Sequence, residues 1–142
     1  MSKKTHDKAN PELVGTPLKI VDGVEAEVEL RATPDMAVDG RGLVHGGFTF
    51  GLADYAAMLS VNHPNVVLGK SESRFIVPVK VGDLMKAKAV VESQDGRRRE
   101  VKVEVTVEEK IVYITKTVID EDLPIEWAIV AFVLGILAGI SL

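Results

Sequence analysis

The sequence predicts an α+β fold in which an antiparallel β-sheet packs around one long central helix. One strand-like segment precedes a long apolar segment of helical length at 46–62, and strand-like segments follow it with no second helix between them. An Asp-Gly turn joins two of the later strands, as in an antiparallel hairpin. The helix is apolar nearly all round, so we expect it to be buried against the sheet.

An arm, a strand and a loop are expected before the helix. Residues 1–15 are polar, and we expect them to form a flexible N-terminal arm. From Leu18 the pattern becomes strand-like, because apolar residues at even positions from Val24 alternate with charged residues up to Arg31. Residues 33–42 are rich in Gly, Pro and Asp, which is typical of a loop.

The helix is expected to begin at Gly46 and to end near Asn62, because the residue before Pro64 resists the helical conformation. Alternating apolar residues then predict four strands, at 66–78, 83–93, 98–108 and 111–119. We expect these four strands to form a meander. The predicted domain covers 16–121.

An apolar tail follows the domain at 122–142. Its part from Trp127 to Leu142 carries no charge over 16 residues, close to the lower limit of about 17 residues for a membrane span. Three interpretations remain open. In the first, residues 125–142 form a membrane anchor, in which Gly135 and Gly139 favour close helix packing in lipid. In the second, the tail is an apolar C-terminal helix that covers the sheet or a subunit interface. In the third, it is a non-native end produced by a change of reading frame.

The composition excludes several classes of function. A chain of 142 residues is long enough for one core and too short for two ordinary domains. Without cysteine, it has no disulfide, no thiolate metal site and no cysteine nucleophile. A net charge of −4 and 5% aromatic residues argue against nucleic-acid binding. The N-terminal segment lacks the apolar region of a secretory signal, so we expect a cytoplasmic protein. We expect no metal and no cofactor.

A His-Gly-Gly sequence opens the predicted helix. The backbone N–H groups of Gly46 and Gly47 lie at the positive end of the helix dipole, where they could polarise a carbonyl or hold an oxyanion. The alternative is that the glycines only permit a tight turn. His45, taken alone, fits a hydrogen-bonded structural histidine.

One acid, Asp54, lies in the middle of the apolar helix. A buried carboxylate needs a partner or water, because burial of an unpaired charge is costly. Asp54 is therefore either functional or paired with a basic residue such as Lys70 or Arg74.

Two segments carry a family resemblance. GLVHGGFTFGLADYAAM at 42–58, with an Asp nine residues after the His, and SRFIVPVKVGDLMKAKAVV at 73–91 resemble the hotdog-fold acyl-CoA thioesterases of the PaaI-like and 4-hydroxybenzoyl-CoA thioesterase-like group. The resemblance covers roughly Leu18 to Ile119. It implies a hotdog fold, with a long helix wrapped by an antiparallel sheet. It also implies a homodimer or a dimer of dimers, with sheets paired edge to edge and sites at the subunit interface.

The resemblance also implies roles for individual residues. Asp54 matches the carboxylate that acts as general base on water or as nucleophile on the thioester carbonyl. Gly46 matches the residue whose N–H polarises that carbonyl, and His45 matches the histidine beside it. Where many relatives have an Asn that helps to hold the water, this chain has Asp39, which cannot donate as an amide does; two nearby acids would also raise the pKa of one. A hydroxyl found in some relatives aligns with Leu68.

The first functional hypothesis is therefore an enzyme that hydrolyses an acyl-CoA without a metal. In it Asp54 activates water, the N–H groups of Gly46 and Gly47 stabilise the oxyanion, and His45 and Asp39 orient the reactants. The hairpin arginines Arg97, Arg98 and Arg99 could bind the CoA phosphates or form a solvated turn.

Two other classes of function compete with the enzyme. Residues 69–91 also resemble the ligand domain of the fatty-acid-synthesis repressors that sense malonyl-CoA without hydrolysing it. Such repressors need a DNA-binding region, for which the N-terminal arm is too short, and a pure binder does not need the acid Asp54. The third hypothesis is a membrane-tethered scaffold in which the domain only dimerises.

Overall fold

The computed structural model describes residues 2–121. Three helical segments lie in this part of the chain: helix α1 (Pro11–Val14), the 3-10 helix η1 (Pro34–Met36) and the long helix α2 (Gly46–Val61). The strands are β1 (Thr16–Val21), β2 (Glu25–Arg31), β3 (Val66–Phe75), β4 (Leu84–Asp95), β5 (Arg98–Val107) and β6 (Lys110–Glu121).

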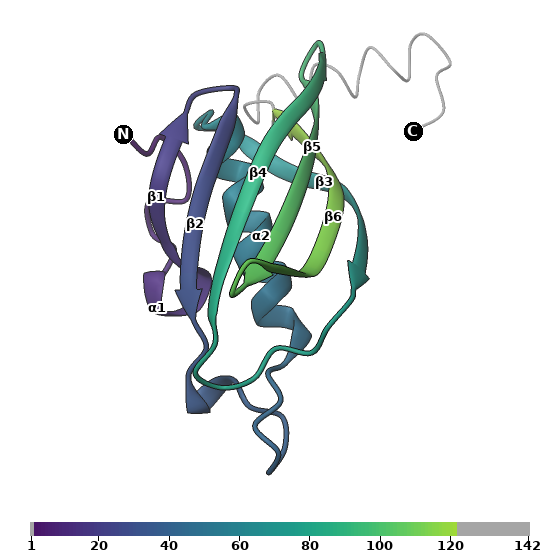
Figure 1. The fold of residues 1–142 in the computed structure, drawn as a ribbon. Coiled ribbons are helices and arrows are strands. Elements are labelled where there is room, and N and C mark those ends of the chain that lie inside the picture. Colours follow the sequence, from purple (N-terminus) through teal and green to yellow (C-terminus); the bar gives the residue numbers. More distant parts are fainter. Residues whose placement is uncertain (1, 122–142) are drawn as a thin grey trace, which may run out of the picture.

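The strands form one antiparallel sheet in the order β1-β2-β4-β5-β6-β3, and α2 lies along one face of it (Figure 1). The predicted α+β class and its hotdog-like arrangement, one long helix against an antiparallel sheet, are therefore confirmed. The apolar C-terminal helix and the membrane anchor predicted for 122–142 lie outside the described residues. Within 2–121, none of the helices has the length and hydrophobicity needed to cross a membrane.

Two details of the predicted sheet are wrong. The strand expected from Leu18 to Arg31 is a hairpin, β1 and β2, that turns at Gly23 with a φ of 71°. The four later strands do not form a meander either, because β3 pairs with β6 at the far edge of the sheet and not with β4. Alternating hydrophobicity shows which side of a strand is buried, but it does not identify the neighbouring strand.

The bounds predicted for the helix are confirmed, and local caps explain them. At the N-terminus of α2, Nδ1 of His45 accepts a hydrogen bond from the Gly47 N–H at 2.8 Å. At the C-terminus, Asn62 has a left-handed φ of 52°, and its N–H donates to the Met58 carbonyl at 2.8 Å. Asparagine tolerates this conformation better than most residues do, so the helix ends there.

Residues 2–15, which the sequence predicts to be a flexible arm, contact the end of α2. The buried Asn62 side chain accepts a hydrogen bond from the Lys4 N–H and donates to the Ser2 carbonyl and to Asp22, each at 2.8 Å. Thr5 is buried as well. These contacts depend on a residue more than fifty positions away, so the polar composition of the arm does not reveal them.

The inner face of the sheet, which faces α2, changes character from one side to the other. Strands β2, β4 and β5 contribute buried aliphatic side chains: Ala26, Val28, Leu30, Met85, Ala87, Ala89, Val101, Val103 and Val105. Along β6 and β3 the same face carries hydroxyl groups: Tyr113, Thr115, Thr117, Ser71 and Ser73. Helix α2 packs mainly over β2, β4 and β5 and touches β3 little. The hydroxyl-bearing part therefore lies toward the β3 edge of the sheet, where α2 makes fewer contacts than over β2, β4 and β5.

Candidate active site

Asp54 lies in the middle of α2 with its side chain largely buried. Its Oδ1 atom is buried and has no hydrogen-bond partner within residues 2–121. The ion pair with Lys70 or Arg74 that the sequence left open is absent from this part of the chain, and Lys70 pairs with Glu72 at 3.2 Å instead. Lys70 and Arg74 alternate with Ser71 and Ser73 along β3, so they point to the outer face of the sheet.

Burial raises the pKa of the Asp54 carboxyl to about 6. Burial is the only cause, so the second carboxylate suspected from the sequence, Asp39, does not contribute to the shift. A carboxylate with such a pKa is ionised at neutral pH and is a stronger base than an ordinary aspartate. That combination suits a general base.

The start of α2 offers one free backbone donor. The Gly47 N–H, expected to face a ligand, is occupied by His45 Nδ1. The Gly46 N–H, in contrast, donates to no acceptor among residues 2–121. Because Nδ1 of His45 accepts this bond, the proton of a neutral imidazole lies on Nε2. His45 therefore acts as the helix cap, and Gly46 is the donor that remains for a ligand.

The start of α2 and the end of β3 are in close contact. A Cβ atom on Gly46 would lie 3.0 Å from Cε1 of Phe75, so only glycine fits without displacing that ring. Phe75 in turn packs edge-on against Tyr113, with 4.8 Å between ring centroids. Phe75, Ile76 and Val77 remain exposed and form an apolar patch at the end of this edge strand.

Asp39 is held by its own loop. The carboxylate accepts hydrogen bonds from the backbone N–H of Arg41 at 2.9 Å and from its guanidinium at 2.8 and 2.9 Å. The hydrogen bond from the Arg41 side chain lowers the pKa of Asp39 below its ordinary value. Asp39 is thus an ionised, exposed residue in the loop before α2, and the structure records no contact between it and Asp54.

The three hairpin arginines differ in their surroundings. Arg98 pairs with Asp120 at 3.4 Å, and Arg99 pairs with Glu121 at 2.6 Å. Arg97 is exposed and forms no ion pair within the described part of the chain. Two of the three arginines are therefore held by neighbouring carboxylates on β6.

The structure adds a group of hydroxyl side chains that the sequence reasoning missed. Ser73 Oγ lies 2.6 Å from the Tyr113 hydroxyl and donates to Thr115 Oγ1 at 3.3 Å. Ser71 Oγ lies 2.9 Å from Thr115 Oγ1 and 3.1 Å from Ser73 Oγ. Thr117 continues the series, 3.2 Å from Thr115. We call these five residues the hydroxyl cluster; the alternation of Ser71 and Ser73 with charged residues was the sequence signal for it.

The charge of Asp54 acts on one member of the hydroxyl cluster, the phenol of Tyr113. Burial raises the pKa of the Tyr113 phenol, hydrogen bonds from Ser73 and Thr115 oppose this rise, and the negative charge of Asp54 adds to it. Leu68, the residue that aligned with a hydroxyl, precedes the cluster on β3 and is partly exposed.

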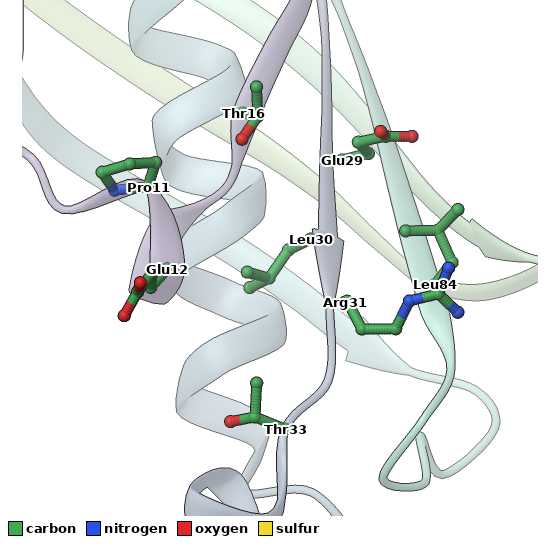
Figure 2. A pocket seen from close by; sticks show the side chains of 8 residues that line it. All are labelled: Pro11, Glu12, Thr16, Glu29, Leu30, Arg31, Thr33 and Leu84. Carbon is green, nitrogen blue, oxygen red and sulfur yellow. The ribbon is translucent and has the colours of Figure 1, made fainter.

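A separate groove of about 670 Å³ lies on the other side of the molecule, beside α1 and β2 (Figure 2). Its lining is mixed: Pro11, Glu12, Thr16, Glu29, Leu30, Arg31, Thr33 and Leu84. None of the predicted site residues is among them. The candidate site lies away from this groove: Gly46 borders Phe75 of β3, and the charge of Asp54 acts on Tyr113 of β6.

Comparison with known proteins supports the fold described above and shows the family. A family model described as the thioesterase superfamily matches residues 41–114, about half of the chain. The crystal structure of an uncharacterized protein from Pyrococcus horikoshii is 50% identical with a TM-score of 0.85, and the match covers 87% of this chain and 95% of that one. An Asn-to-Asp mutant structure of the phenylacetic acid degradation protein PaaI from Thermus thermophilus is 29% identical with a TM-score of 0.71, covering 79% and 97%.

Two curated relatives are longer than this chain. A methylthioribose-1-phosphate isomerase from Aquifex aeolicus is 50% identical over 104 residues, which are 73% of this chain and 23% of that protein. The transcription factor FapR from Caldanaerobacter subterraneus is 30% identical over 102 residues, 72% of this chain and 51% of that protein. The chain thus spans about a quarter and about half of the length of these two relatives.

Proposed function

Because this chain belongs to the thioesterase superfamily, we propose that it hydrolyses an acyl-CoA thioester to a free acid and CoA. The observation that supports this proposal is Asp54, a buried carboxylate whose Oδ1 has no partner within residues 2–121 and whose pKa is raised to about 6. Because Oδ1 has no hydrogen-bond partner there, the charge of Asp54 does not stabilise the fold. In this proposal the domain at 16–121 carries the activity.

The proposed reaction uses two groups of the chain. Ionised Asp54 accepts a proton from a water molecule that attacks the thioester carbonyl carbon. Alternatively, Asp54 attacks that carbon itself and forms an acyl–Asp54 anhydride once the thiolate has left, and a water molecule then hydrolyses the anhydride to the free acid. The free N–H of Gly46 donates a hydrogen bond to the carbonyl oxygen as negative charge develops on it. The carbon–sulfur bond then breaks, and the CoA thiolate leaves and is protonated. His45 fixes the Gly47 N–H and so supports the geometry of the donor beside it.

Both groups act on one carbonyl only if the site is shared between two subunits. Gly46 and Asp54 are eight residues apart on α2, roughly 12 Å at 1.5 Å per residue, which is too far for one carbon atom. In a homodimer, Asp54 of one subunit meets Gly46 of the other. The sheet edge formed by β3, with exposed Phe75, Ile76 and Val77, suits pairing with a second copy.

Among the arginines proposed for the CoA phosphates, we retain Arg97 as the first choice. Arg98 and Arg99 already pair with Asp120 and Glu121, so recruiting them would break existing ion pairs. The exposed Arg97 has no such cost.

Replacing Asp54 by Asn tests the proposal. We expect Asp54→Asn to lower turnover of acyl-CoA about a hundredfold or more, the size expected for a positioned base, while CoA-ester binding is kept. Thiol release from a panel of acyl-CoAs measures turnover, and calorimetry measures binding. Asp95→Asn, an exposed Asp at the β4–β5 turn, is the matched control and should retain full activity. Activity of Asp54→Asn within a few-fold of wild type would exclude Asp54 as the base.

The match to FapR favours one second candidate, a module that binds an acyl-CoA without hydrolysing it. This candidate predicts tight CoA-ester binding by the wild-type protein and no thiol release from any acyl-CoA of the panel. The same two measurements therefore separate the enzyme from the binding module.

A further inference from the structure

The inner face of β6 and β3 carries hydroxyl-bearing side chains at positions where aliphatic side chains would pack equally well. Threonine and valine have nearly the same shape, and the corresponding positions of β5 are Val101, Val103 and Val105. At Thr115 and Thr117 the chain buries hydroxyl groups instead, which is unfavourable unless each is hydrogen-bonded. The change from aliphatic to hydroxyl-bearing side chains occurs at Tyr113, Thr115 and Thr117 of β6, which α2 contacts less than it contacts β5.

The hydroxyl cluster also extends from the buried interior to an accessible edge. Tyr113, Thr115 and Thr117 are buried, Ser71 is half-buried, and Ser73 is exposed. Ser73 contacts Tyr113 at 2.6 Å and Thr115 at 3.3 Å, so its hydroxyl joins the exposed end of the cluster to the buried part. Thr115 donates to the Glu72 carbonyl at 3.0 Å, which fixes the direction of its own proton.

Pairing of β3 with a second copy would leave this face accessible. Strand pairing uses the backbone N–H and C=O groups at the edge, whereas Ser71 and Ser73 project from the inner face. Gly46 borders the same region through Phe75, which contacts both Gly46 and Tyr113. The hydroxyl cluster of the subunit that supplies Gly46 therefore borders the place where the Gly46 N–H would hold the thioester.

We propose that the hydroxyl cluster is the acyl-recognition wall of the site and selects acyl groups with a neutral hydrogen-bonding substituent over plain alkyl groups of the same length. This inference rests on the proposed function, since it assumes an acyl-CoA at Asp54. It also predicts discrimination against acyl groups that end in a carboxylate. The charged residues of β3, Lys70, Glu72 and Arg74, point to the outer face, and Asp54 would repel a second negative charge.

The test compares matched acyl-CoAs. We expect wild-type kcat/KM for 3-hydroxybutyryl-CoA to exceed that for butyryl-CoA about threefold to tenfold, the effect of one neutral hydrogen bond, and malonyl-CoA to be the poorest substrate of the three. Ser73→Ala and Thr115→Val should bring the ratio of the first two substrates close to one. Thr106→Val, a threonine of β5 paired with Lys86 away from the cluster, is the matched control and should leave the ratio unchanged.

The preference for 3-hydroxybutyryl-CoA over butyryl-CoA is also measured as a ratio of Kd values on the Asp54→Asn variant. This binding measurement tests the recognition wall independently of whether the protein hydrolyses thioesters. A binding preference for the hydroxylated ester that Ser73→Ala removes supports the recognition wall, even if wild-type protein hydrolyses nothing. Equal Kd values for the two esters, or a preference that both Ser73→Ala and Thr115→Val leave intact, would overturn it. If wild-type protein hydrolyses both esters with equal kcat/KM, the recognition wall is refuted, and the proposed thioesterase activity is still supported.

Discussion

Asp54 couples the proposed activity to pH, because only its ionised form can accept a proton. Its pKa is raised to about 6 by burial, so the carboxylate fraction falls below that pH. We expect kcat/KM to be level above about pH 7 and to fall about tenfold per pH unit well below pH 6. A pH profile of kcat/KM with butyryl-CoA as substrate measures this fall on the acid side. An acid limb centred near pH 4, where an ordinary Asp titrates, would show that the buried Asp54 is not the group that limits the rate.

The same carboxyl makes the folded chain less stable as the pH rises. Below about pH 4 Asp54 is neutral in both folded and unfolded chains and costs nothing. Between pH 4 and 6 the unfolded chain releases its proton first, because the folded pKa of about 6 lies above the ordinary value of 3.8. The folded state therefore loses stability through this window, by about 3 kcal/mol at most for a shift of this size.

Asp54→Asn should remove this loss. We expect the variant to be more stable than wild type by about 2 kcal/mol at pH 8, with a difference near zero at pH 4, because an amide resembles the neutral carboxyl in size and has no charge to bury. Urea denaturation of both proteins at equal concentration, at pH 4 and pH 8, measures the free energies of unfolding. A difference that does not change with pH would mean that Asp54 is not ionised at a cost in the folded state.

Individual site residues were predictable to different degrees. Asp54 and Gly46 stood out because a lone acid in an apolar helix and a Gly-Gly at a helix start are local anomalies. The occupation of the Gly47 N–H by His45 was not predictable, since it depends on one side-chain rotamer. The hydroxyl cluster was missed because its members come from two strands whose pairing the sequence did not reveal.

At the scale of elements, the end of α2 depends on Asn62 more than on the proline that follows it. The buried Asn62 side chain makes three hydrogen bonds to residues 2–22 and holds a left-handed φ of 52°. We expect Asn62→Ala to destabilise the protein by about 2–4 kcal/mol, because it leaves buried polar groups unpaired and puts alanine in an unfavourable conformation. Urea denaturation measures the change.

Asn62→Gly separates the two causes. Glycine adopts a positive φ freely but makes none of the side-chain bonds, so its cost should lie below that of alanine and stay above about 1 kcal/mol. The amide proton of Lys4, bonded to Asn62 in wild type, should exchange faster in both variants. Unchanged stability in both would show that the contacts of residues 2–5 do not contribute to folding.

Elements with local signals were predictable, and their neighbours were not. The β1–β2 turn did have a signal, Asp22-Gly23, of the same kind that predicted the β4–β5 hairpin at Asp95-Gly96. Because the regular alternation of apolar residues begins at Val24, directly after this turn, residues from Leu18 to Arg31 were interpreted as one strand. The pairing of β3 with β6 has no comparable local signal. It depends on the position at which the chain leaves α2, which places β3 at the far edge of the sheet beside β6.

For the whole molecule, the distance between Gly46 and Asp54 requires two chains to complete one proposed site. A homodimer with a two-fold axis contains two equivalent sites, each with Asp54 from one subunit and the start of α2 from the other. Two variants that are inactive alone should therefore complement each other. We expect His45→Ala, which removes the cap beside Gly46, and Asp54→Asn to be such a pair.

Mixing the two variants gives a quantitative expectation. In a mixed dimer one site receives both defects and the other receives neither. With random pairing, about half of the dimers are mixed and half of their sites are intact, so about a quarter of wild-type activity should return. Co-refolding equal amounts of the two chains and measuring thiol release tests this, and a differently tagged pair verifies that subunits exchange. If well-folded variants exchange subunits and recover no activity, Asp54 and Gly46 do not act across an interface, and Asp54 works within its own chain or has no part in catalysis.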